Sequence, residues 1–203
     1  MEKKIKNIVL ISIIIIDFAL LLYSISINHY DEISAIITLP LTLLIPTIVK
    51  KVLKIKITDF FEIIFYTFIF LAQFLGSCIN LYDKIYWFDD FTHFLSGIFS
   101  CLIAIAILKI FKKNTNKDIA FNIIFIFGIV FIIAGCWELI EFAIDQILGS
   151  NMQHSIDSGV NDTMFDILRA TIGAIVFNLA YFLENKNKNK KGIILKIQDK
   201  LIK

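Results

Sequence analysis

The sequence predicts an all-α polytopic membrane protein, built as a bundle of about six transmembrane helices. Hydrophobic residues make up 58% of the 203-residue chain, and the mean hydropathy is +0.78. These residues occur in long runs and do not alternate with polar residues at the period of a soluble helix or strand. Runs of this kind recur six times, and roughly 20 helical residues are enough to cross a bilayer.

The six apolar segments follow one another along the whole chain. Every backbone polar group in hydrocarbon must find its partner within the protein, so we expect each segment to be a helix. The short alternating strands of a membrane barrel are not visible in the sequence. The expected helices cover residues 7–28, 33–49, 59–80, 91–111, 118–148 and 163–183.

Lysines are concentrated in every second loop between these segments. Nineteen of the 20 basic residues are lysine, and Arg169 is the single arginine. Loops rich in lysine stay on the cytoplasmic side. The pattern therefore predicts a multi-pass protein of the cell (inner or plasma) membrane with both termini cytoplasmic. The basic groups are Lys3, Lys4 and Lys6; Lys50, Lys51, Lys54 and Lys56; Lys109, Lys112, Lys113 and Lys117; and the tail from Lys186 onward.

The chain divides into a membrane part and a tail. Residues 1–183 are expected to form the six-helix transmembrane domain, and residues 184–203 a basic cytoplasmic tail. Tail lysines attract anionic lipid, and a short amphipathic pattern near the end suits the inner leaflet, with a frayed tail as the alternative. Membrane lipids are therefore the expected partners. No basic patch interleaved with aromatic residues lies outside the apolar segments, so nucleic-acid binding is not expected.

Acidic and histidine residues gather at one end of the last three segments. Ionisable residues are costly inside a membrane, and they mark functional sites. His93 lies near the predicted outer boundary, Glu138 lies roughly 28 Å along the fifth segment, and Asp166 opens the sixth. All three therefore reach the same depth. The full set is Asp89, Asp90, His93, Glu138, Glu141, Asp145, His154, Asp157, Asp162, Asp166 and Arg169.

Helical spacing places these side chains on three faces. Members of each set are three, four or seven residues apart, so each set occupies one face of its helix. Carboxylates with imidazole suit zinc, manganese or iron, and carboxylates alone suit magnesium or calcium. We predict a divalent-metal site (zinc, manganese or magnesium) whose ligands are Asp90, His93, Glu138, Glu141 and Asp166. Catalytic roles would fall to Glu138 and Glu141 as acid–base groups and to Arg169 as a phosphate ligand.

A structural polar network is the alternative interpretation of the same residues. In it Arg169 pairs with Asp166, and Glu138 or Glu141 bonds to His93 or to the backbone. Asp145 extends the face of the fifth segment. The loop residues Asp89, Asp157 and Asp162, each taken alone, are typical helix caps or solvated residues, and His154 is typical of an exposed loop residue.

Asp17 is a separate case, because it lies near the middle of the first segment. A buried hydrogen bond to Gln73, Asn122 or Asn178 is one interpretation, and a place on a transport path is the other.

Three glycines are predicted to mark close helix contacts. Gly97, Gly128 and Gly173 lie within the fourth, fifth and sixth segments, where small residues let backbones approach.

Several ordered blocks resemble the YjdF-like bacterial inner-membrane proteins. The likeness covers about residues 60–183 and implies the cell envelope without naming a substrate. A more distant likeness to VanZ-type proteins rests on the helix-opening Asp-x-x-His, although Arg169 and Ala170 stand near the position where that pattern has asparagine. The blocks are Phe88-Asp89-Asp90-Phe91-Thr92-His93-Phe94-Leu95-Ser96-Gly97, Trp137-Glu138-Leu139-Ile140-Glu141, Asp157, Asp162-Thr163-Met164-Phe165-Asp166-Ile167-Leu168 and Gly173.

Three functions remain open at this point. The first is metal-dependent chemistry or binding on a lipid headgroup or a lipid-linked envelope precursor. The second is a cation or small-solute transporter, and the third is a non-catalytic envelope protein with a structural polar network. The sequence contains no Gly-x-Ser-x-Gly, phosphate-cradling loop or His-Glu-x-x-His pattern, so it leaves open whether the protein is an enzyme.

Overall fold

The computed structural model describes residues 1–111, 118–153, 158–186 and 192–202. Within these ranges the chain is helical and has no strand, apart from one isolated bridge between Ile57 and Ile202. Six helical stretches are long and apolar enough to cross a membrane, which confirms the predicted fold class. The chain forms two compact units, Met1–Thr92 with Asp199–Lys203, and His93–Gln198.

The exposed surface of the helices is apolar. Ile124, Leu139 and Val52 are each about two-thirds exposed or more, whereas Asp17, Glu62 and Asp166 are among the most buried side chains. This inside-out distribution is typical of helices whose outer faces contact lipid.

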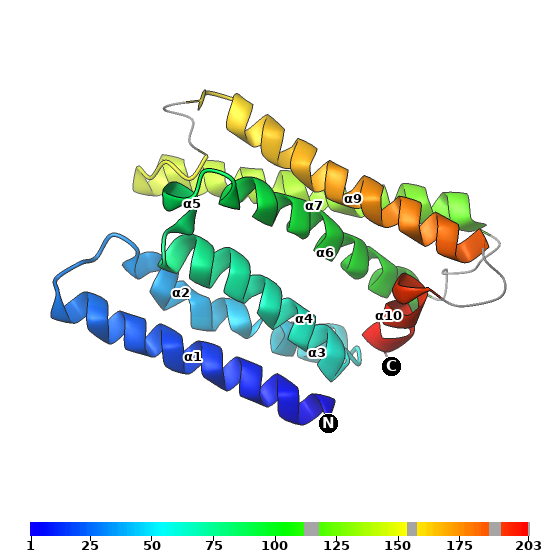
Figure 1. The fold of residues 1–203 in the computed structure, drawn as a ribbon, viewed down its shortest axis with the longest axis horizontal. Coiled ribbons are helices and arrows are strands. Elements are labelled where there is room, and N and C mark those ends of the chain that lie inside the picture. Colours follow the sequence, from blue (N-terminus) through cyan, green and yellow to red (C-terminus); the bar gives the residue numbers. More distant parts are fainter. Residues whose placement is uncertain (112–117, 154–157, 187–191, 203) are drawn as a thin grey trace. The chain divides into compact units, whose positions relative to one another are not determined.

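The first unit is built around α1, which packs against α2 and α4. Figure 1 shows these three helices lying side by side. Its elements are α1 (Glu2–Ser26), α2 (Ile33–Leu43), α3 (Ile45–Leu53), α4 (Asp59–Ile69), the π-helix η1 (Phe70–Cys78) and α5 (Leu81–Lys84).

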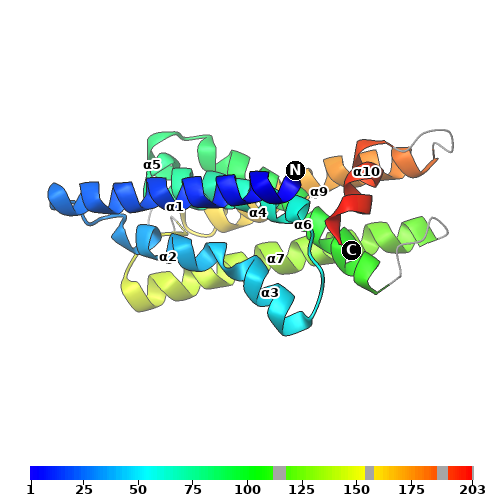
Figure 2. The same cartoon turned by 90° about the horizontal axis from the view of Figure 1, so that it is seen from below.

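The second predicted helix, 33–49, is interrupted in the structure. α2 and α3 are separated at Leu44, and Figure 2 shows α3 continuing in the direction of α2. Pro40 lies inside α2 and Pro46 in the first turn of α3, and a proline cannot donate the backbone hydrogen bond of a regular helix. α3 then runs to Leu53, further than expected, and ends at Lys54 in the left-handed region.

The third predicted helix, 59–80, changes type halfway. Thr58 caps α4 by accepting a hydrogen bond from the Phe61 backbone N–H at 3.2 Å. After Ile69 the chain continues as the π-helix η1, a rare form that recurs at functional sites. The ring of Tyr82 lies against Gly76 so closely that a Cβ there would overlap it, and its hydroxyl donates to the Ala72 carbonyl at 2.8 Å.

The second unit contains the helices that carry most of the predicted site. Its elements are α6 (Phe88–Ile110, whose first five residues belong to the first unit), α7 (Ile119–Leu148), α9 (Asn161–Lys186) and most of α10 (Ile193–Leu201). α6 begins three residues earlier than the predicted 91, so Asp89 and Asp90 lie in its first turn. The amphipathic end of the tail is helical as α10, and the Glu184 carboxylate accepts hydrogen bonds from the Ile194 and Leu195 backbone N–H groups.

Two of the three predicted glycine contacts are confirmed. A Cβ at Gly97 would overlap the Ala170 carbonyl, and one at Gly173 would overlap the Phe94 carbonyl, so α6 and α9 approach to backbone contact. The prediction for Gly128 is wrong, because no atom lies within 4 Å of where its Cβ would stand.

Candidate functional site

The close approach of α6 and α9 places His93 beside Asp166. His93 lies one helical turn before Gly97, and Asp166 lies one turn before Ala170, so the glycine contact sets their separation. His93 Nε2 is 3.8 Å from Asp166 Oδ2. The Asp166 side chain is 3% exposed and that of His93 is 14% exposed. The two side chains therefore meet in a largely water-free environment.

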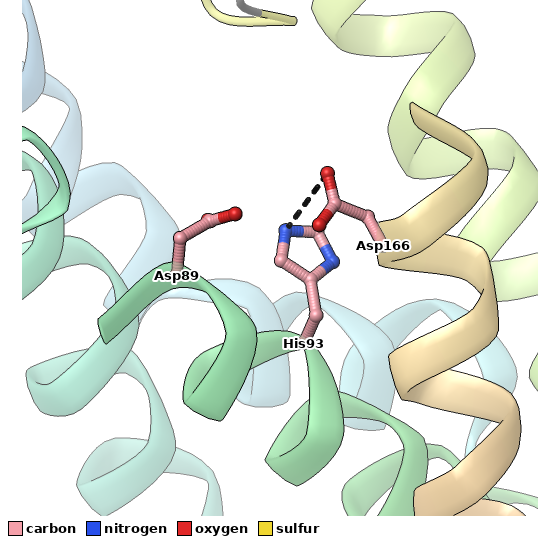
Figure 3. A group of neighbouring side chains, drawn as sticks. All are labelled: Asp89, His93 and Asp166. Carbon is pink, nitrogen blue, oxygen red and sulfur yellow. Dashed lines mark ion pairs between the residues drawn. The ribbon is translucent and has the colours of Figure 1, made fainter. Parts of the chain in front are cut away.

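Asp89 completes a group of three metal-type ligands. It lies four residues before His93 on the same continuous helix, and hence on the same face. One ligand atom each of Asp89, His93 and Asp166 lies within 4.8 Å of the other two. Figure 3 shows both carboxyl groups pointing toward the imidazole.

The structure places Asp89, and not the predicted Asp90, in this group. With the helix expected to cover residues 91–111, Asp89 was expected in the preceding loop, and Asp90 was matched to His93 by its three-residue spacing. Because α6 begins at Phe88, the four-residue spacing of Asp89 places it on the face of His93 that meets α9. A predicted helix start at Phe88 would have identified Asp89 as the ligand.

Arg169 engages the second oxygen of Asp166. Its Nη1 is 3.3 Å from Asp166 Oδ1, and its guanidinium lies over the Phe165 ring at 5.2 Å. The ion pair expected for a structural network is thus present. Asp166 is shared between Arg169 and His93.

Two glutamates of α7 lie next to this group. Glu138 is 6% and Glu141 7% exposed. Glu141 interacts electrostatically with Glu138, His93 and Asp166, and Glu138 interacts with His93 and Asp162. The predicted convergence of acids from three helices is therefore observed.

The Glu138 carboxylate is only partly satisfied. Thr163 and Gln153 hydrogen-bond to it, and the Gln153 amide also donates to the Glu138 backbone carbonyl at 3.2 Å and to the Thr163 hydroxyl at 3.1 Å. Its Oε2 is buried and has no hydrogen-bond partner among the described residues. A buried carboxylate oxygen left in this state favours a cation or a proton.

Asp145 has a different role from the one its spacing suggested. Its carboxylate accepts hydrogen bonds from the Ser150 hydroxyl at 2.6 Å, the Met152 N–H at 2.8 Å and the Gln153 N–H at 3.0 Å. It therefore holds residues 150–153, which follow α7. Asp162 lies in the first turn of α9 near Glu138. Asp157 and His154 lie outside the described residues.

Asp17 belongs to the first unit and has none of its expected partners. The Gln73 amide donates to Ala35 and Thr38, the Asn122 amide to the Tyr181 hydroxyl, and the Asn178 amide to the Ala174 carbonyl of its own helix. Asp17 is 4% exposed, and its Oδ1 has no hydrogen-bond partner among the described residues. The predicted hydrogen bond to Gln73 is therefore wrong.

A second charged cluster, which the sequence did not reveal, lies in the first unit. Glu62 is 2% exposed and bonds to Lys50 and, at 3.1 Å, to Lys6, which also bonds to Asp59 at 2.5 Å. The available signal was the position of Glu62 one turn after Asp59 in an otherwise apolar run.

Among the described residues, the acids near His93 outnumber the bases. Asp89, Glu138, Glu141 and Asp166 are offset by Arg169 and by whatever charge His93 carries. Neighbouring carboxylates repel one another, and a divalent ion or shared protons relieve that repulsion. Imidazole with carboxylates is a ligand set for zinc and manganese.

Comparison with known proteins supports a membrane protein and does not identify its chemistry. An uncharacterized protein of Thermotoga maritima is 27% identical over 135 residues, which is 65% of this chain and 69% of that protein. No solved structure matches. The distant VanZ-type likeness is not shown, whereas the likeness to YjdF-like proteins is consistent with the family that matches residues 8–187. The chain belongs to that family, described as predicted membrane protein DUF2238.

Proposed function

We propose that this integral membrane protein binds a divalent metal ion between α6 and α9 and uses it on a phosphate-bearing lipid headgroup or lipid-linked envelope precursor. The observation that carries the proposal is the group formed by Asp89, His93 and Asp166, whose ligand atoms lie within 4.8 Å of one another. Two ligand atoms on one zinc or manganese ion stand roughly 3 to 4 Å apart, so small side-chain rotations close the site. Zinc, manganese and magnesium are the ions to test.

Glu138 and Glu141 support the site from α7. Glu138 Oε2 is buried and without a hydrogen-bond partner among the described residues, which gives the group a further oxygen ligand or a base for a bound water. Glu141 adds negative charge beside His93 and Asp166. Asp90, the ligand predicted from sequence, stays a candidate that mutagenesis separates from Asp89.

Arg169 supplies the contact to the substrate. Its guanidinium pairs with Asp166 in the structure. A metal ion on Asp166 would weaken this pair and free the planar donors of Arg169 for phosphate oxygens. The lysine pattern predicts cytoplasmic termini, and that orientation would put the site at the outer headgroup level, where lipid phosphates lie.

Metal content of the purified protein tests the proposal. Elemental mass spectrometry is run on detergent-purified wild type, His93→Ala, Asp166→Asn, and the matched pair Asp89→Asn and Asp90→Asn. We expect about one ion per wild-type chain, a loss in His93→Ala and Asp166→Asn, and a larger loss in Asp89→Asn than in Asp90→Asn. The exposed Asp83→Asn is the control that keeps its metal.

Two results would count against the proposed metal site. Wild type that carries no metal after equilibration with zinc, manganese and magnesium contradicts the proposal and leaves the structural network as the better account. Metal that persists in both His93→Ala and Asp166→Asn places the ion elsewhere.

A further inference from the structure

A cavity of about 300 Å³ lies in the first unit, between the end of α1, the loop that follows it and the end of η1. Tyr23 and Ile27 of its lining are 60% and 50% exposed, so the cavity borders the surface. At about 1.5 Å per residue, Tyr23 lies roughly 26 Å along α1 from Lys6. This length is close to the thickness of the hydrocarbon layer, so with Lys6 at one boundary the cavity lies at the headgroup level of the other.

The turn that ends α1 brings polar side chains to this cavity. Asn28 adopts the left-handed conformation with a φ of 54°, and the His29 N–H donates to the Ser24 carbonyl at 2.9 Å, as in a Schellman turn. His29 Nε2 then lies 2.8 Å from Oε2 of Glu32, the residue before α2. Ser24, His29 and Glu32 all line the cavity.

The lining carries charges of both signs. Lys84 Nζ donates to the Ile79 carbonyl at 2.6 Å, but this acceptor is neutral and the ammonium group has two further N–H donors. The Glu32 carboxylate is hydrogen-bonded to His29, and a neutral imidazole can make that bond without removing the negative charge. The positive charge of Lys84 and the negative charge of Glu32 therefore belong to the same lining.

A ligand with only one sign of charge does not suit this lining. Lys84 would repel a simple cation. Glu32 would repel a simple anion, and so would Asp17, which does not line the cavity but interacts electrostatically with Cys78 of its wall. A ligand that carries both charges satisfies Lys84 and Glu32 together. The rest of the wall is largely apolar, so the same ligand should also have an apolar part.

We propose that this cavity binds the headgroup of a zwitterionic phospholipid with a primary ammonium group, a phosphoethanolamine lipid. Its phosphate would accept hydrogen bonds from Lys84, and its ammonium group would donate to Glu32. The first part of the acyl chains would lie along Leu20 and Ile27. A choline headgroup fits less well, because it cannot donate to a carboxylate and is recognised by aromatic cages. Among the described residues of the lining, Tyr23 alone is aromatic.

Native mass spectrometry of the full-length protein in detergent tests this site. The protein is titrated with phosphatidylethanolamine, phosphatidylcholine and phosphatidylglycerol that carry identical dioleoyl chains. The variants are Lys84→Gln and Glu32→Gln, each of which removes one charge from the lining. Lys51→Gln and Asp83→Asn make the same kinds of change at exposed positions outside the lining.

We expect wild type to bind phosphatidylethanolamine about tenfold more tightly than the other two lipids, which corresponds to one charge-assisted hydrogen bond. Lys84→Gln should weaken binding of the ethanolamine and choline lipids alike, because both contain the phosphate. Glu32→Gln should remove the preference for ethanolamine over choline, because the ammonium group loses its partner. Lys51→Gln and Asp83→Asn should behave like wild type. Water-soluble phosphoethanolamine should compete only at far higher concentration, since it lacks the acyl chains.

Equal affinity of wild type for the ethanolamine and choline lipids would overturn the site, and so would a preference that survives in Glu32→Gln. Unchanged lipid affinity of Lys84→Gln would overturn the phosphate contact. Competition by phosphoethanolamine at the concentration of the lipid would contradict a membrane lipid as the ligand. If a variant fails to fold, the comparison of the lipids on wild type decides the question. The lining belongs to the first unit alone, so the metal content of each variant should equal that of wild type.

Discussion

Two buried charged clusters differ in how their charges are balanced. The lysine–acid cluster of the first unit (Lys6, Lys50, Asp59 and Glu62) joins two bases to two acids through direct ion pairs. The acid–histidine cluster (Asp89, His93, Glu138, Glu141 and Asp166) brings four carboxylates together, with Arg169 as their one arginine partner.

The difference separates a structural role from a binding role. Taking a charge out of water is costly, and a partner of opposite sign offsets that cost. The lysine–acid cluster contains its own partners, so it can fix α1, α3 and α4 without any other species. Among the described residues the acid–histidine cluster holds more acids than bases, so a bound cation or protons would offset its remaining negative charge. Burial alone does not distinguish the two, since Glu62 and Glu138 are both under a tenth exposed.

The largest effect is expected from breaking the lysine–acid cluster. Glu62→Gln removes the acid that Lys6 and Lys50 share, and loss of one partner of a buried ion pair costs about 3 kcal/mol of unfolding free energy. Thermal unfolding in detergent measures the change, and metal content should not move. Glu2→Gln, which disrupts the exposed 3.9 Å pair with Lys200, is the matched control. Equal stability of Glu62→Gln and wild type would contradict a structural role.

Adding metal should stabilise the acid–histidine cluster only. At about 100 times the dissociation constant, a ligand that binds the folded state alone adds about 2.7 kcal/mol. Wild type and Glu62→Gln should both gain this increment in thermal unfolding, and Asp166→Asn should not. An equal gain in Asp166→Asn would show that the ion binds at another place.

A substitution outside the proposed ligands should loosen the contact between α6 and α9. Gly97→Ala forces a Cβ into the Ala170 carbonyl, and such overpacking costs about 2 kcal/mol. Because the same contact sets the separation of His93 and Asp166, metal affinity should fall as well. Gly128→Ala, which adds a Cβ where no atom lies within 4 Å, should be neutral or slightly stabilising. Similar behaviour of the two variants would argue against this role for Gly97.

The smallest expected effect is a gain in stability, in contrast to the losses expected for Glu62→Gln and Gly97→Ala. Glu138→Gln in the metal-free protein removes one of several mutually repelling carboxylates, so the unfolding free energy should rise by about 1 kcal/mol. The metal-induced gain should shrink in the same variant. A fall in metal-free stability would instead favour the structural network.

Much of this fold could be predicted because the bilayer imposes it. The lengths of the apolar runs give six spans, and helical spacing brings Glu138, Glu141 and Asp166 near His93. Long-range features could not be predicted in the same way. The partners of Glu62, Lys6 and Lys50, come from two other helices, and only packing brings them together.

Local deviations from a regular helix were also invisible in the sequence. Because α6 starts earlier than expected, Asp89 takes the place in the group that was predicted for Asp90. The composition of η1 does not distinguish this π-helix from an α-helix. Asp145 has helical spacing to Glu138, yet the end of α7 turns it to the following loop. Periodicity alone cannot show where a helix begins, ends or changes its pitch.

X-ray absorption spectroscopy of the zinc-loaded protein is the most direct test of the metal site. We expect a coordination shell of oxygen and nitrogen at roughly 2.0 to 2.2 Å that contains one imidazole, and we expect the imidazole signal to vanish in His93→Ala. A wild-type spectrum with water oxygens alone, or an imidazole signal that survives in His93→Ala, would contradict a metal centre between α6 and α9.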